Sequence, residues 1–201
     1  MQYQITGMEY LKRGRVAVEL NGEETFLLYR GEAASLSIGE YLSQEEYDKI
    51  VHDILGKRAK KRAMHLLERQ ERSEAKLREK LAEGQYPQPA IEDAIEYVKR
   101  YHYVDDRRFA GTYVVFHQEQ KSRYQLKMDL YRKGIAKDLI EEVLEETFDT
   151  DEKELIAHWL EKKRYEEKKD DPKERRKMYQ FLLRKGFRSS DICSVMNLSD
   201  W

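Results

Sequence analysis

The spacing of hydrophobic residues changes after the first quarter of the chain. Before that point, "RVAVEL" and "ETFLLY" carry the β-branched and aromatic residues typical of strands, and Asn21 and Gly22 between them tolerate positive φ. For residues 1–56 we therefore predict a small antiparallel sheet of two or three strands. A helix should follow, because Ser43 and Glu46 have the spacing of a capping box.

From about residue 57 onward, apolar residues recur at helical spacing, and one order of three helices returns three times. Each first helix carries an alanine followed by apolar residues, at positions that lie 47 apart: Ala63, Ala110 and Ala157. Each second helix runs into a glycine, where we expect a left-handed turn: Gly84, Gly134 and Gly186. Each third helix carries an apolar triad, which begins at Ile91, Ile140 or Ile192.

The clearest repetition joins "LYRKGIAKDLIEEVL" (130–144) to "LLRKGFRSSDICSVM" (182–196). These segments are identical at six of fifteen positions at an offset of 52. Self-similarity near 50 residues is typical of repeat architectures. Helix caps are expected at Ser73, at Asp105 and Asp106, and at Asp171. We therefore predict a mainly α protein of tandem three-helix repeats over 57–102, 103–149 and 150–201, after the N-terminal β segment.

Composition agrees with helices, because the 201 residues include only 10 Gly and 3 Pro. The 38 basic and 39 acidic residues give a net charge of -1, which excludes a general cationic coat for nucleic acid. Residues 1–56 hold five basic and ten acidic residues, so basic residues are in excess over the repeats. An anionic partner would have to bind a local patch.

Such patches recur on the second helices. Residues 121–137 carry six cations against Asp129, whereas 138–154 carry nine acids against Lys153. The cluster "KRAKKR" opens the first repeat, and the basic residues of the third repeat are denser still. Solvated helix faces are one interpretation, and an extended track for an anionic partner is the other. The candidate partner- or DNA-binding residues are Arg107, Arg108, Arg123, Lys127, Arg132, Lys133, Arg175, Arg176, Lys177, Arg184, Lys185 and Arg188.

The sequence offers no catalytic constellation. Its five histidines form no HExxH motif, no glycine-rich phosphate loop is present, and Cys193 is the single cysteine. We therefore predict no enzymatic activity, no cofactor and no metal. A signal peptide and a membrane-spanning run are also not evident, which predicts a cytoplasmic protein. The helix–Gly–helix unit suggests a helix-turn-helix, but acidic third helices would be repelled by DNA phosphates.

Residues 103–144 resemble the RecX family of regulatory proteins. The resemblance rests on an acidic pair, an Arg-Phe-Ala run and a Leu-x-x-x-Gly-Ile turn: Asp105, Asp106, Arg108, Phe109, Ala110, Leu130, Gly134 and Ile135. It extends over the flanking repeats, and residues 1–56 resemble the extension that some members carry. The sequence departs from the family at "QKSRYQLK" (120–127), which lacks the usual Gly-Pro-like connection.

The resemblance implies a protein that binds the RecA recombinase and restrains its filament on single-stranded DNA, as an elongated, curved array in the filament groove. We expect the protein to be a monomer. From the charge pattern, our hypothesis is that residues 107–137 and 173–188 carry much of the electrostatic contact. The rival hypothesis is a stand-alone single-strand nucleic-acid binder, which pull-down with and without nuclease would distinguish. An enzyme is a remote third class, because nothing assembles a nucleophile, a base and an oxyanion donor.

Overall fold

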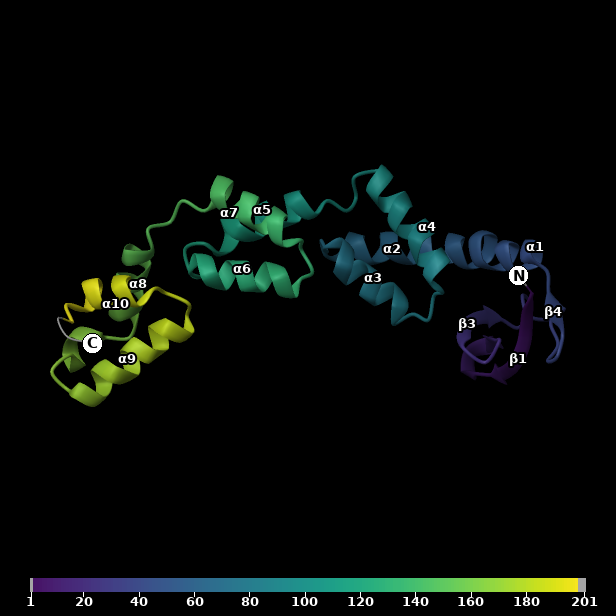
Figure 1. Cartoon of the computed structure of the whole chain (residues 1–201), viewed down its shortest axis with the longest axis horizontal. Helices are drawn as coiled ribbons and strands as arrows, with labels where there is room; N and C mark the ends of the chain where they lie inside the picture. The colour runs from purple at the N-terminus through teal and green to yellow at the C-terminus, as the bar shows by residue number, and fades with distance from the viewer. Residues whose placement is uncertain (1, 199–201) are drawn as a thin grey trace. The chain divides into compact units, whose positions relative to one another are not determined.

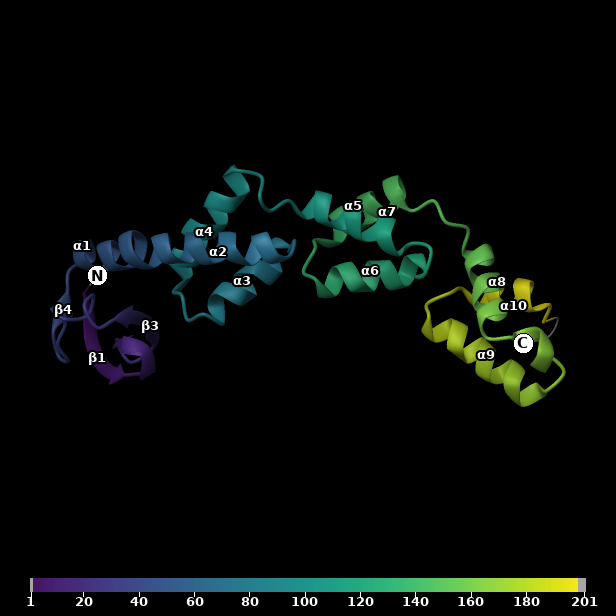
Figure 2. The same ribbon diagram turned by 180° about the vertical axis from the view of Figure 1, so that it is seen from behind.

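The computed structural model describes residues 2–198 and is mainly helical, with a small sheet near the N-terminus (Figure 1). Residue 1, at the start of the predicted segment 1–56, lies outside the described residues. Residues 199–201, at the end of the predicted repeat 150–201, also lie outside them. The chain divides into two compact units, Met1–Asp105 and Asp106–Trp201. Figure 2 shows the same elements from behind. Within residues 2–198, no helix is long and apolar enough to span a bilayer.

The sheet is antiparallel and contains four strands in the order β3-β2-β1-β4. The strands are β1 (Tyr3–Tyr10), β2 (Arg15–Leu20), β3 (Glu24–Tyr29) and β4 (Tyr41–Leu42). The predicted hairpin joins β2 to β3, and Asn21 and Gly22 have φ of 53° and 76°. The two-residue β4 was not predicted, since two residues are too few to show a strand period. Alternate residues such as Val16, Val18 and Phe26 are fully buried on one face.

The helix predicted at Ser43 begins there, and both bonds of its capping box form. The Glu46 amide donates to Ser43 Oγ at 3.3 Å, and the Ser43 amide donates to Glu46 Oε2 at 2.8 Å. This helix, α1 (Gln44–Asp48), continues through a π-helical segment (Lys49–Gly56) into α2 (Lys57–Arg69). Gly56 has helical φ of -61°. The boundary predicted between residues 56 and 57 therefore lies inside a continuous helical run.

The sheet and the first helical trio share one hydrophobic core. The trio consists of α2, α3 (Glu74–Ala82) and α4 (Gln88–Arg100). Arg58 on α2 joins the two parts, because its guanidinium donates to Leu27 O at 3.0 Å and pairs with Glu32 at 2.5 Å. The N-terminal segment thus packs on the first trio as part of the same unit.

The second and third trios each have a core of their own. The second contains α5 (Asp106–His117), α6 (Arg123–Arg132) and α7 (Lys137–Thr147). The third contains α8 (Glu152–Lys162), α9 (Pro172–Arg184) and α10 (Ser189–Met196), with a 3-10 turn at Tyr165–Lys168. Equivalent core positions are buried in all three trios, as the repeat pattern predicts. Examples are Leu81, Leu130 and Leu182, and Ile91, Ile140 and Ile192.

The alanine spacing was wrong for the third trio. Ala63 and Ala110 are fully buried, but Ala157 is exposed, and Leu155 and Ile156 enter the core instead. Ala110 is the fifth residue of α5, whereas Ala157 is the sixth of α8. Ile156 takes the buried position in α8, and one residue turns a helical side chain by about 100°, so Ala157 lies off the buried face.

The glycine turns also need one correction. Gly134 and Gly186 have left-handed φ of 80° and 82°, but Gly84 does not, and Gln85 takes the left-handed position at 57°. A Cβ on Gly84 would lie 3.0 Å from the Tyr86 ring, so close packing is the constraint there. Gln85 stands four residues after Leu81, as Gly134 stands after Leu130, which explains its left-handed position.

The second and third trios touch within their unit around a buried serine. Ser122 caps α6 by accepting a bond from the Gln125 amide at 3.2 Å. Its hydroxyl also donates to the carbonyl of Lys185 in the third trio at 2.6 Å. Beside it, the Arg123 amide donates to Glu152 Oε1 at 3.0 Å. The start of α6 is therefore bonded to both α8 and the turn after α9.

Candidate partner-binding surface

The basic residues predicted in the second trio mostly pair with acids of the same trio. Arg107 on α5 bonds Glu146 on α7 at 2.9 Å and also pairs with Glu142. The hydrogen bond from Arg107 to Glu146 raises the pKa of Arg107 further above its usual range. Lys127 on α6 pairs with Glu141 on α7. These contacts neutralise cations that the sequence pattern offered to a partner.

A second group of contacts surrounds Asp129 on α6. Lys121 Nζ lies 2.8 Å from Asp129 Oδ2, and the Tyr113 hydroxyl donates to the same oxygen at 3.0 Å. Arg132 pairs with the other oxygen of Asp129. Burial raises the pKa of Asp129, but hydrogen bonds from Lys121 and Tyr113 outweigh it, so the pKa lies below its ordinary value. The single acid of the predicted basic run thus holds its neighbouring cations in place.

The remaining predicted residues of this trio have different surroundings. Arg123 donates to the carbonyl of Leu144 at 3.2 Å, which satisfies the C-terminal end of α7. Lys133 Nζ lies 4.9 Å from the centre of the Tyr113 ring, in cation–π geometry. Arg108 is exposed on α5. Arg123 and Lys133 therefore help to hold the trio together.

The third trio leaves more positive charge exposed. Arg176, Arg184 and Arg188 are exposed, whereas Lys185 Nζ packs 4.3 Å from the centre of the Trp159 ring. Arg175 is half-buried, and its Nε is buried without a hydrogen-bond partner. The predicted residues therefore differ in their surroundings, and those of the third trio are the more accessible.

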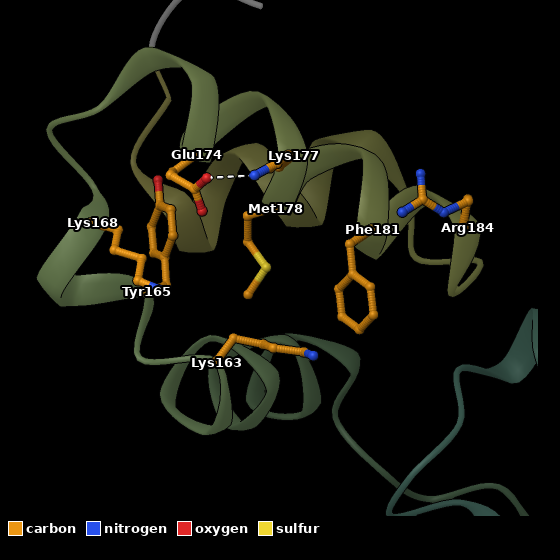
Figure 3. A pocket seen from close by; sticks show the side chains of 8 residues that line it. All are labelled: Lys163, Tyr165, Lys168, Glu174, Lys177, Met178, Phe181 and Arg184. Carbon is orange, nitrogen blue, oxygen red and sulfur yellow. Dashed lines mark hydrogen bonds and ion pairs between the residues drawn. The ribbon is translucent and has the colours of Figure 1, made fainter.

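A hollow in the third trio brings Lys177 and Arg184 together with cations that sequence reasoning missed (Figure 3). Its volume is about 370 Å³. Lys177 pairs with Glu174 at 2.7 Å, a contact that raises the pKa of Lys177. Lys163 and Lys168, in the connection between α8 and α9, complete the positive rim. The charge run "EKKRYEEKK" (161–169) carries five cations, but the three acids mixed among them concealed the clustering.

Metal ligands and nucleophiles in proteins are often His, Cys, Asp or Glu side chains. Within residues 2–198, no group of three or more His, Cys, Asp or Glu side chains could hold a metal ion. His52 Nδ1 lies 2.7 Å from Asp93 Oδ2, which joins the π-helical segment to α4. Cys193 is half-buried on α10. Asp106 begins α5, where an acid suits the helix N-terminus.

The three trios match three family models in chain order. Residues 59–97 match the first three-helix domain of RecX, 105–144 the second and 150–196 the third. The chain belongs to the RecX family of regulatory proteins. This result confirms the resemblance found in the central repeat and over the two flanking repeats.

Whole-length relatives agree with the domain matches. The regulatory protein RecX of Clostridioides difficile is 32% identical, covering 96% of this chain and 94% of that protein. The regulatory protein RecX of Caldanaerobacter subterraneus is 31% identical, covering 92% and 90%. A solved structure, the crystal structure of regulatory protein RecX, shares the fold at a TM-score of 0.64 and 24% identity, covering 97% and 99%. These relatives are named as regulatory proteins.

Proposed function

We propose that this RecX-family chain binds the RecA recombinase and its filament on single-stranded DNA, and thereby inhibits the recombinase. The observation that carries the proposal is the ordered match of all three trios to the RecX domains. The chain acts by binding and not by catalysis, which agrees with the names of its relatives.

The repeated trios suit a partner that is itself a polymer of identical subunits. Similar modules can contact successive subunits, and each further contact then forms at a high effective concentration. Weak contacts at several trios thereby give tight binding without a single deep site. Such avidity needs only the repetition of the helices, and it arises in any arrangement in which more than one trio can bind at once.

The structure changes which cations we assign to the contact. Arg132 and Lys127 pair within the second trio, and Lys185 packs on Trp159, so reversing them would disturb the fold. Arg176, Arg184 and Arg188 are exposed on the third trio and can be changed with little structural cost. We assign the main electrostatic contact to these three arginines.

The test is recombinase ATPase activity on single-stranded DNA, titrated with wild type and with the triple variant R176E/R184E/R188E. We expect the variant to need roughly tenfold more protein for the same inhibition, because three exposed charge pairs are each worth about 0.2–1 kcal/mol. Its helical circular dichroism should match wild type. Unchanged inhibition would remove the assignment of these residues, and absence of inhibition by wild type would remove the proposed function.

A stand-alone single-strand nucleic-acid binder is the second candidate. Tyr124 and Tyr131 on α6 are 58% and 61% exposed, and exposed aromatic rings beside basic residues can stack on bases. Pull-down of the recombinase after nuclease treatment separates the two candidates. Retention of the recombinase without DNA supports the first candidate, and its loss supports the second.

A further inference from the structure

The hollow in the third trio has a positive rim and an apolar floor. Figure 3 shows Met178 and Phe181 pointing from α9 toward Lys163, with Tyr165 beside them. Met178 and Tyr165 are each only 7% exposed, so they form a packed floor. A volume of about 370 Å³ is sufficient for a large side chain and is at the lower end of ordinary ligand sites.

The rim selects for negative charge. Four cations and one acid line the hollow, and the acid, Glu174, is already paired with Lys177. Lys163, Lys168 and Arg184 therefore contribute uncompensated positive charge at the opening. An anionic group placed there gains attraction from several cations and displaces no internal ion pair.

The floor disfavours a nucleic-acid base as the occupant. Lys163 Nζ lies 5.2 Å and Lys185 Nζ 5.8 Å from the centre of the Phe181 ring. Trp159 meets the same ring edge-on, with 5.6 Å between the centroids. Tyr165 is too buried to present a face. A base stacks on an open aromatic face, whereas a flexible Met178 can accommodate an aliphatic or aromatic side chain.

We propose that this hollow binds an acidic peptide segment of a partner protein, with one apolar side chain of the segment inserted between Met178 and Phe181. The acidic residues of the segment pair with Lys163, Lys168 and Arg184 at the rim. The inference rests on the proposed function only in taking the regulated recombinase as the protein that carries the segment. The hollow itself can be tested without the recombinase.

The probe is a short fluorescent peptide of Asp and Glu with one central Phe, titrated with the full-length chain at low salt. Fluorescence anisotropy gives its dissociation constant. A peptide with Gly in place of Phe should bind at least fivefold more weakly, because it leaves the apolar floor empty. Equal binding of the two peptides would show that the hollow is not occupied and would overturn the proposal.

The variant K168E/R184E should weaken binding of the Phe peptide about tenfold, since two exposed attractions become repulsions. The matched control is K153E/K173E, which makes the same charge change at two exposed lysines of the same trio outside the hollow. It should alter affinity by less than twofold. Equal losses in both variants would show a general charge effect, and no loss in K168E/R184E would exclude the rim. Either result overturns the proposal.

An oligothymidine of matched charge provides the last comparison. Tighter binding than the peptide, with the same sensitivity to K168E/R184E, would assign the hollow to nucleic acid and overturn the proposal. Peptide binding together with absent recombinase inhibition would support the hollow and reject the proposed function. Recombinase inhibition without peptide binding would do the reverse, so the two failures are distinguishable.

Discussion

Replacing Gly186 with Ala should destabilise the second unit far more than an ordinary glycine substitution. Gly186 has φ of 82°, where a Cβ costs about 1–2 kcal/mol from backbone strain alone. A Cβ there would also lie 2.6 Å from Tyr124 Cδ1 and 2.9 Å from Ser122 Oγ. Tyr124 is largely exposed and its ring can move away, but Ser122 is fully buried and cannot.

Displacing Ser122 breaks its hydrogen bonds to Lys185 O and to the Gln125 amide. Leaving such buried groups unpaired costs about 1–3 kcal/mol. The sum for G186A is therefore about 2–5 kcal/mol. The backbone control is G14A, because Gly14 has φ of 71° and a Cβ added there would have no neighbour within 4 Å. G14A should cost only about 1–2 kcal/mol.

Urea unfolding followed by circular dichroism measures both variants, and S122A completes a double-mutant cycle with G186A. S122A removes the hydroxyl that the new Cβ would meet, so the double variant should lose roughly 1 kcal/mol less than the sum of the single losses. Strict additivity, or a G186A loss equal to that of G14A, would refute the steric reasoning.

Three further outcomes are expected. Burial lowers the pKa of His117, and Lys121 adds to the effect; the unfolded state therefore binds the proton more tightly, and the free energy of unfolding should fall as pH decreases from about 7 through the folded pKa. H117Q should flatten that slope in urea titrations at successive pH values. S73A should lower stability by about 1–2 kcal/mol, because Ser73 is a fully buried N-cap of α3, as chemical denaturation would show. S43A should lower it by about 1 kcal/mol in the same assay, since it removes one half of the capping box.

The repeat and its helix caps could be predicted from sequence because both depend on local spacing. Equivalent leucines and isoleucines recur at fixed offsets, and the buried core follows them. Ser43, Ser73 and Asp171 all cap helices as predicted. A cap needs only an oxygen-bearing side chain a few residues before an apolar run, so the signal is complete within the segment.

The incorrect predictions concern features that depend on the exact position of a residue along its helix or turn. The repeat pattern alone does not determine that position. A common spacing of alanines placed Ala157 on the core face, although its helix begins one residue earlier relative to the alanine. We predicted the left-handed turn at Gly84 because glycine favours positive φ, but Gln85 adopts that conformation. The boundary predicted at residue 56 followed the change to helical spacing, whereas the helical backbone runs through Gly56.

The charge pattern along the chain gave only part of the candidate site. Whether a lysine is free depends on which helix packs against it, and this is a tertiary property. Lys127 and Arg107 face the acids of α7, and the hollow needs Lys163 and Lys168 to fold back toward α9. Neither arrangement has a signature in local spacing.

The difference between the second and third trios follows from their third helices. α7 carries five acids (Asp138, Glu141, Glu142, Glu145 and Glu146), whereas α10 carries only Asp191. The basic helix α6 therefore faces a neutralising partner, and the basic helix α9 does not. Binding to an anionic surface should consequently lose more from R176A than from R107A, although both residues are exposed arginines. Equal losses at several salt concentrations would show that internal ion pairing does not decide which cations serve the partner.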